Sequence, residues 1–186
     1  MKVIFLGTNG WYDTDTGNTV CTLIETKERF IILDAGNGLY KIGKYIKTNK
    51  PIYLFLSHFH LDHIIGFHIL NKFCFKQGID VYGPPGTENI LKRFINMPYT
   101  IPIDKLKTKI RLKDLLKNNS APDFVKFRRL LHSTICFGYR FNIDGRVVSY
   151  CTDTGVCENL FKLAQNADLL IAECSYKSNK EDKNWP

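Results

Sequence analysis

Leu-Ser-His-Phe-His-Leu-Asp-His, residues 56–63, is the stretch of sequence that decides the fold. Six positions hold three histidines and one aspartate, namely His58, His60, Asp62 and His63. An apolar run over residues 52–56 leads into the stretch and predicts a buried strand. A second apolar run, from Ile64 to about Phe75, has helical spacing. The four polar side chains are therefore expected on a turn between a strand and a helix, where rigid elements hold reactive groups in place.

This clustering suits metal binding better than it suits folding. Neutral imidazole binds zinc, iron and related transition metals, and a carboxylate compensates their charge. His58 and His60 are two positions apart, so both can point the same way from an extended segment. Asp62 and His63 begin the expected helix and can face the same cavity from another side. The alternative, a polar turn with solvated histidines, does not explain why three of the five histidines lie beside an acid.

The pattern His-x-His-x-Asp-His at residues 58–63 resembles the signature of the metallo-β-lactamase superfamily. Features further along the chain make it similar to the ribonuclease Z-like branch, as a small member without that branch's protruding arm. The resemblance covers essentially the whole chain and implies a four-layered αββα sandwich, the metallo-β-lactamase fold. The order of elements alone predicts only an α/β or α+β protein. We expect a single domain over residues 1–186.

The resemblance also implies two further metal ligands, His132 and Asp153. His132 follows an expected strand and stands alone, and Asp153 lies in Cys-Thr-Asp-Thr-Gly at the end of another. From the residues alone, a structural histidine and an aspartate that caps the next helix remain open. The implied assignment gives the first ion three ligands, the second ion two, and both ions a bridging carboxylate: His58, His60 and His132; Asp62 and His63; Asp153.

Other residues are expected to support this site. The family places an Asp-x-Gly turn under the ligands, and Asp34 begins such a turn here, although it could instead cap a helix over residues 39–48. Glu173 matches a glutamate that orients a later histidine in the family. Trp11 and Tyr12 are candidates for a wall of the site, because the first loop often forms one in this superfamily.

The implied chemistry is hydrolysis by a water that two divalent metal ions activate. Zinc is the first choice for a histidine-rich site, with manganese or iron as alternatives. Asp62 is the expected catalytic residue and accepts the proton of the water. The leading hypothesis is a phosphodiesterase. The alternatives are a carboxylic ester, lactone or thioester hydrolase on the same metal core, and an impaired, non-catalytic binding protein.

The chain departs from the family pattern in two places. It contains no histidine after Asp153, although the family has a last ligand and a general-acid histidine further on. We therefore expect a chain truncated after Pro186, or a tail that is not recorded, with the C-terminal part of the fold missing. The alternative is a second metal ion that binds weakly. Only 20 residues, 133–152, separate His132 from Asp153, which leaves no room for an arm that grips tRNA.

Composition and net charge limit the kinds of partner that are expected. The formal charge is +8, which favours an anionic small-molecule or nucleotide substrate, and nucleic acid as a partner. The densest basic stretches are residues 105–117 and 126–129, and a plainly solvated lysine surface is the alternative. No apolar run reaches the roughly 18 residues that a membrane helix needs, so no membrane partner is expected. A cytoplasmic protein is expected, and a homo-oligomer is open.

The remaining pattern predicts short strands and helices in alternation. Strands are expected at residues 2–7, 19–26, 29–33, 79–82, 124–131, 135–143, 147–152 and, as a buried strand, 168–173. Helices are expected at residues 39–48, 88–96 and 156–164, and residues 99–119 should form strand and loop along one edge. The six cysteines include no Cys-x-x-Cys pair, which predicts reduced, buried thiols.

Overall fold

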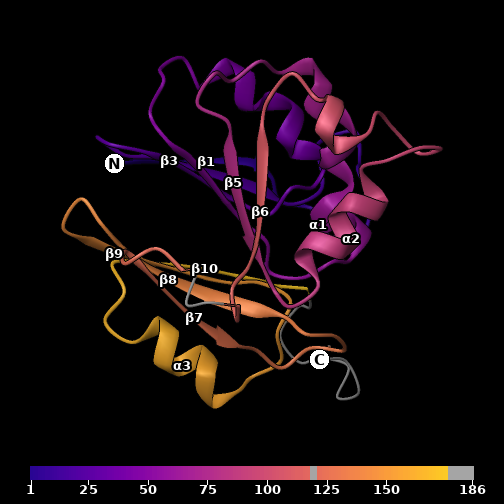
Figure 1. Cartoon of the computed structure of the whole chain (residues 1–186). Coiled ribbons are helices and arrows are strands. Elements are labelled where there is room, and N and C mark those ends of the chain that lie inside the picture. Colours follow the sequence, from indigo (N-terminus) through magenta and orange to yellow (C-terminus); the bar gives the residue numbers. More distant parts are fainter. Residues whose placement is uncertain (118–120, 176–186) are drawn as a thin grey trace. The chain divides into compact units, whose positions relative to one another are not determined.

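The computed structural model describes residues 1–117 and 121–175. The chain forms two compact units, Met1–Ser120 and Ala121–Pro186, and each is described by itself (Figure 1). The sequence-based prediction of a single domain stays a prediction. No helix among the described residues has the length and apolar character needed to cross a bilayer.

A mixed six-stranded sheet forms the first unit (Figure 1). Its strands follow one another in chain order: β1 (Lys2–Gly7), β2 (Cys21–Glu25), β3 (Phe30–Leu33), β4 (Ile52–Phe55), β5 (Ile79–Gly83) and β6 (Ile110–Asp114). The pairs β1–β2 and β2–β3 are antiparallel, and the three later pairs are parallel. The predicted hairpin and the predicted strand along one edge, β6, are both confirmed.

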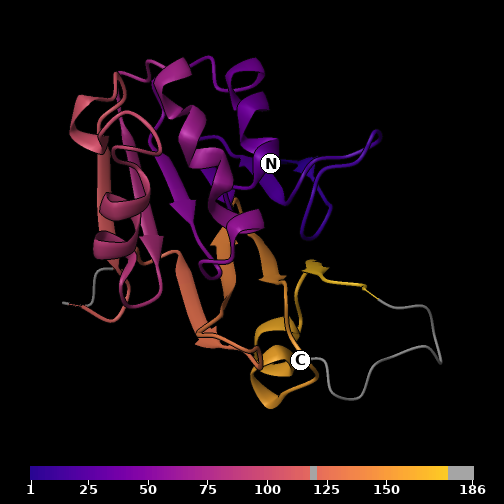
Figure 2. The same ribbon diagram turned by 90° about the vertical axis from the view of Figure 1, so that its right-hand side faces the viewer.

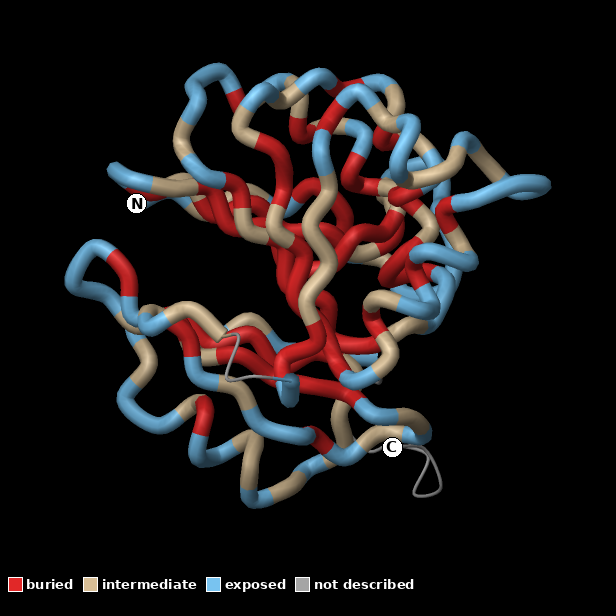
Figure 3. The backbone as a smooth tube through the Cα atoms, in the orientation of Figure 1, coloured by how far each residue is buried: buried red, intermediate tan, exposed pale blue. Residues whose placement is uncertain are grey.

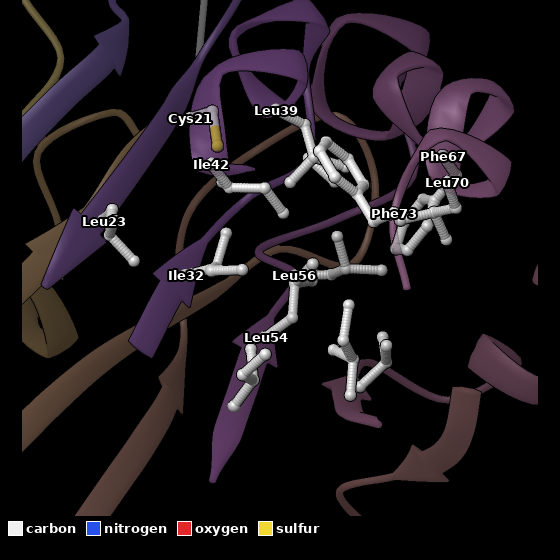
Figure 4. Close-up of a cluster of buried hydrophobic side chains, with 14 of the residues drawn as sticks. Cys21, Leu23, Ile32, Leu39, Ile42, Leu54, Leu56, Phe67, Leu70 and Phe73 are labelled. Carbon is white, nitrogen blue, oxygen red and sulfur yellow. The ribbon is translucent and has the colours of Figure 1, made fainter. Parts of the chain in front are cut away.

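Short helices connect these strands and cover the core of the first unit. They are η1 (Asn37–Lys44), α1 (Leu61–Ile64), η2 (Ile65–Lys72), α2 (Thr87–Phe94) and η3 (Ile103–Lys105), where η marks a 3₁₀ helix. Leu39 and Ile42 of η1 and Phe67 and Leu70 of η2 pack into one apolar cluster with Leu54 at the centre of β4 (Figure 4). All four residues of β3 and most of β4 are buried (Figure 3), which agrees with their continuous apolar sequence.

The helices that precede and follow the histidine-rich stretch at residues 56–63 differ from the prediction. The sequence predicts one α-helix from Ile64 to about Phe75, whereas the structure has one turn of α1 followed by the 3₁₀ helix η2. The reason is a tertiary hydrogen bond: the N–H of Gly66 donates to the carbonyl of Ala35 at 2.8 Å instead of continuing the α-helical ladder. The helix predicted at residues 39–48 is likewise a shorter 3₁₀ helix, η1.

The second unit is a four-stranded sheet with one helix (Figure 2). Its elements are β7 (Val125–Arg129), β8 (Phe137–Ile143), β9 (Arg146–Cys151), α3 (Glu158–Ala164) and β10 (Leu169–Ala172), in the strand order β10-β9-β8-β7. Strands β7, β8 and β9 are antiparallel, and β10 joins β9 in parallel after the crossover through α3. Asp144 and Gly145, both at positive φ, form the tight turn of the predicted β8–β9 hairpin.

The predicted burial of the last strand is wrong. The sequence predicts a buried strand at residues 168–173, and β10 does form there, but its residues are half-buried or exposed. Within the described chain β10 stands at the end of the strand order and pairs only with β9. An apolar sequence in this position therefore does not report burial.

Substitution of Gly66 by alanine tests the contact that ends α1. A Cβ at Gly66 would lie 2.2 Å from the carbonyl oxygen of Gly36, which is backbone and cannot move aside. We expect Gly66→Ala to lower the free energy of unfolding by about 1–3 kcal/mol or more. The matched control is Gly10→Ala, whose Cβ would meet nothing within 4 Å. Urea unfolding of both variants measures this, and equal stability of the two would contradict the packing described.

Candidate metal centre

The turn after β4 carries the predicted ligands of the first unit. Strand β4 ends at Phe55 and α1 begins at Leu61, so His58 and His60 lie between these two elements, and Asp62 and His63 lie in α1, as expected. His60 has an extended backbone at the N-terminus of α1, with φ −61° and ψ 147°. His58, Asp62 and His63 are buried, and His60 is exposed. One turn thus presents three imidazoles and one carboxylate.

The side chains of this turn converge. The ring of His58 lies 4.4 Å from that of His60 and 4.1 Å from that of His63, centroid to centroid. His58 can offer a ring nitrogen within 4.8 Å of one from either neighbour. The Nε2 atom of His63 lies 3.6 Å from the Oδ2 atom of Asp62. Two ligands about 2.1 Å from one ion in a tetrahedral arrangement are about 3.4 Å apart, so this pair suits a shared ion.

Asp34 lies behind the ligands and is fully buried. Its Oδ1 accepts the backbone N–H of Ser57 at 2.7 Å, and its Oδ2 accepts the hydroxyl of Ser57 at 2.8 Å. The same Oδ2 atom is 2.8 Å from Nδ1 of His63. Asp34 therefore joins the end of β3 to the ligand turn. Its service to a metal site, as the resemblance implies, stays a prediction.

These contacts fix the tautomers of two histidines. A carboxylate only accepts hydrogen bonds, so Nδ1 of His63 carries the proton and Nε2 keeps a lone pair. The single proton of the Ser57 hydroxyl goes to Asp34, so in its 3.0 Å contact with Nδ1 of His58 the ring must be the donor. His58 therefore also keeps its lone pair on Nε2. Ser57 was missed in the sequence analysis, because one serine between apolar and ligating residues carries no pattern.

The backbone of Asp34 is strained in a way that its surroundings support. Its φ is 55°, in the left-handed region that residues other than glycine rarely adopt. Its N–H donates to the carbonyl of Phe55 at 2.9 Å, and two residues later a Cβ at Gly36 would lie 2.3 Å from the carbonyl of Asp62. The alternative of a helix cap is wrong: η1 is preceded by Gly36, and no side chain caps it. The Asp-x-Gly turn instead brings two backbones into direct contact.

The first loop supports Asp62 through its backbone. The N–H of Trp11 donates to Oδ2 of Asp62 at 2.8 Å, while the rings of Trp11 and Tyr12 are exposed. Asp13 organises the loop by accepting the backbone N–H of Thr19 at 2.7 Å and the side-chain amide of Asn37 at 2.9 Å. Burial raises the pKa of Asp13, but these hydrogen bonds and one from Asn18 outweigh it, so its pKa lies below the usual value. A wall formed by Trp11 and Tyr12 stays a prediction.

The second unit brings its two predicted ligands onto adjacent segments. Leu131, next to His132, forms an isolated antiparallel bridge with Gly155, whose N–H donates to the carbonyl of Leu131 at 2.9 Å. The N–H of Leu131 in turn donates to Oγ1 of Thr154 at 3.2 Å. Asp153 has φ 49° and accepts the hydroxyl of Thr152 at 2.8 Å. Like Asp34, it is an aspartate in the left-handed region close to the end of a strand, two residues after β9.

Three other expectations have different outcomes. Glu173 is exposed beyond β10, where it accepts a hydrogen bond from Ser175, and its orienting role stays a prediction. None of the six cysteines forms a disulfide, as predicted, and Cys21, Cys136 and Cys151 are buried as expected. Cys157 is only half-buried, and the prediction of burial is wrong outright for Cys74 and Cys174, which are exposed. Both lie after the regular element that carries the apolar pattern, where packing no longer covers them.

The donor chemistry of the ligand turn fits a divalent transition metal. Imidazole Nε2 atoms with fixed lone pairs and a nearby carboxylate are the ligands that zinc, manganese and iron accept. A hydrogen bond from the second ring nitrogen to a buried carboxylate, as His63 makes to Asp34, is the usual support of a ligating histidine. These residues are therefore suited to hold divalent metal ions.

Comparison with known proteins identifies the protein family. A family model described as a beta-lactamase superfamily domain matches residues 29–184, and the chain belongs to that superfamily. The metallo-beta-lactamase fold protein YhfI from Bacillus subtilis covers 96% of this chain and 73% of its own, with 20% identity and a TM-score of 0.77. The short form of human tRNase Z covers 91% and 76%, with 23% identity and a TM-score of 0.70. The predicted metallo-β-lactamase fold is confirmed.

Curated relatives carry the name Ribonuclease Z. The one from Microcystis aeruginosa is 25% identical over 95% of this chain and 73% of its own length. The one from Pyrococcus abyssi is 25% identical over 98% and 77%. The similarity to the ribonuclease Z-like branch that the motif predicted is confirmed, and so is the general class of the protein, a metal-dependent hydrolase.

Removal of the Ser57 hydroxyl tests how the ligands are held. Ser57→Ala leaves Nδ1 of His58 without its acceptor and frees the ring to change tautomer. We expect zinc affinity, measured by competition with a chromophoric chelator, to fall about 10–100-fold. The matched control is Ser149→Ala, which removes another buried hydroxyl, bonded to the carbonyl of Leu163. A control that loses as much affinity would contradict a specific role of Ser57.

Proposed function

We propose that this chain hydrolyses phosphodiester bonds of nucleic acid at a site that holds two divalent ions. The observation that carries the proposal is the convergence of His58, His60, Asp62 and His63 on one turn, with two rings oriented by Asp34 and Ser57. By the family resemblance, His132 and Asp153 would join these residues in holding the ions. Zinc is the proposed metal, with manganese and iron as alternatives.

The residues of the chain divide the work. When bound, divalent ions supply Lewis acidity and an activated water near neutral pH. His58 and His63 present their Nε2 lone pairs, and the Asp34–Ser57 pair keeps the rings from rotating. Asp62 is the proton acceptor for the attacking water, with its Oδ2 held in place by the N–H of Trp11. A carboxylate that is buried and anchored in this way needs no rearrangement during the reaction.

Two facts support a nucleic-acid phosphodiester over other esters. The curated relatives are named Ribonuclease Z, and the formal charge of this chain is +8. The comparison with the Microcystis aeruginosa relative runs over 237 residues, more than the 186 of this chain, so that relative has internal residues without a counterpart here. The segment between His132 and Asp153 is the β8–β9 hairpin. The proposed substrate is therefore held without a protruding arm.

Hydrolysis of bis-p-nitrophenyl phosphate tests the proposal. We expect turnover by the zinc- or manganese-loaded full chain, loss of turnover after chelation, and recovery when the metal is restored. A lactone substrate is assayed in parallel. Absence of phosphodiester turnover in the loaded protein, or a clear preference for the lactone, would overturn the proposal.

The substitution Asp62→Asn tests whether Asp62 acts as the proton acceptor in catalysis. The amide keeps the shape of the side chain but cannot accept a proton, so we expect kcat for the phosphodiester to fall about 10²–10⁴-fold. Asp104→Asn, an exposed aspartate of η3 in the same unit, is the control and should keep full activity. Zinc content is measured for both variants, since a loss of metal alone would leave the catalytic role of Asp62 unsupported.

A further inference from the structure

A cationic groove lies in the second unit between β7 and α3. Its volume is about 720 Å³. Four cations line it, namely Lys126, Arg128, Arg140 and Lys162, together with Gln165 and Asn166. None of the described residues that line it is acidic. The basic stretch 126–129 could bind an anion or be merely solvated, and its position in this groove favours anion binding.

The register of the sheet gathers these cations on one face. Lys126 is paired with Arg140 of β8, and Arg128 is paired with Gly138. Residues directly opposite each other in antiparallel strands point to the same side. A Cβ at Gly138 would lie 2.6 Å from the side chain of Leu163 in α3, so this side is the one that α3 covers. Lys126 and Arg128 therefore extend beside α3, and both are exposed.

This arrangement concentrates positive charge on one face of the sheet. Like charges directly opposite each other in a sheet destabilise it, and Lys126 and Arg140 are such a pair. Arg140 is held in place, because its guanidinium donates to the carbonyls of Leu163 and Gln165 at 2.6 and 2.7 Å. Glu158, at the first turn of α3, does not line the groove, but it pairs with Lys162 at 2.6 Å and its charge also acts on Arg128, so it compensates part of this positive charge. Phosphates bound along the groove would reduce the repulsion between Lys126 and Arg140.

We propose that this groove binds the sugar–phosphate backbone of single-stranded RNA, with Lys126, Arg128 and Lys162 as the phosphate contacts. The choice of RNA rests on the proposed function, whereas the groove and its charge do not. Phe127 lies between the two β7 cations in sequence, but its side chain points to the other face of the sheet, where its ring packs 5.0 Å from that of Phe137. The proposed contacts in the groove are therefore to phosphates.

The direction of β7 connects the groove with the predicted ligands of the same unit. His132 follows Arg128 by four residues, roughly 13 Å along extended chain. An RNA strand bound along Lys126 and Arg128 would thus continue toward the segments that carry His132 and Asp153. The groove would bind the RNA substrate on the surface of the four-stranded sheet. It would take the place of the protruding arm that other ribonuclease Z-like proteins have.

Binding of a short RNA to the full chain tests the groove. The probe is a fluorescein-labelled 12-nucleotide single-stranded RNA, and anisotropy is measured at several salt concentrations in the presence of chelator, so that no cleavage interferes. The groove variant is Lys126→Gln with Arg128→Gln. The matched control is Lys44→Gln with Lys76→Gln, two exposed lysines of the first unit, which removes the same charge.

We expect the groove variant to bind about tenfold or more weakly at low salt, with a salt slope reduced by about 1.4, the value for two lost phosphate contacts. The control should keep nearly the wild-type slope. Wild-type binding by the groove variant, or equal losses in both variants, would overturn the inference. Because the readout is binding without cleavage, RNA binding that depends on the groove in a chain that fails to hydrolyse the phosphodiester would refute only the proposed function.

Discussion

The carboxylate of Asp34 is the constraint on which the candidate site depends. Buried at the end of β3, it accepts hydrogen bonds from the backbone and hydroxyl of Ser57 and contacts Nδ1 of His63. One acid thus sets the path of the ligand turn and the tautomers of two imidazoles. Its left-handed backbone and the close approach of Gly36 to Asp62 show that the surrounding sheet supports an otherwise costly conformation. The rigidity of the ligands follows from the packing of β3 and β4.

The sequence predicted the features that repeat a pattern and missed those that depend on single contacts. Short apolar runs predicted the strands, and the density of histidines predicted the ligand turn. The 3₁₀ helix η2 could not be predicted, because the hydrogen bond from Gly66 to Ala35 joins residues 31 positions apart. Ser57 was missed for the same reason, since its partner Asp34 is 23 positions away. The exposure of β10 depends on its place in the strand order, which apolar composition does not report.

The chain has two proposed binding sites with different chemistry, one in each unit. The ligand turn of the first unit supplies imidazoles and a carboxylate that are fixed before any substrate arrives. The groove of the second unit supplies exposed cations that the register of β7 and β8 gathers on one face. Positions that work against stability, such as Lys126 opposite Arg140 and Asp34 at positive φ, coincide with the two places where binding is proposed. Such coincidence is expected when function opposes local stability.

The tautomers of His58 and His63 test the central claim most directly. Long-range ¹H–¹⁵N correlation spectra of the metal-free protein at pH 8 distinguish a protonated Nδ1 from a protonated Nε2 in each ring. We expect a proton on Nδ1 and a lone pair on Nε2 for both histidines, because Ser57 accepts from Nδ1 of His58 and Asp34 from Nδ1 of His63. A proton on Nε2 of either ring would contradict this expectation and would remove the structural basis for metal binding by that histidine.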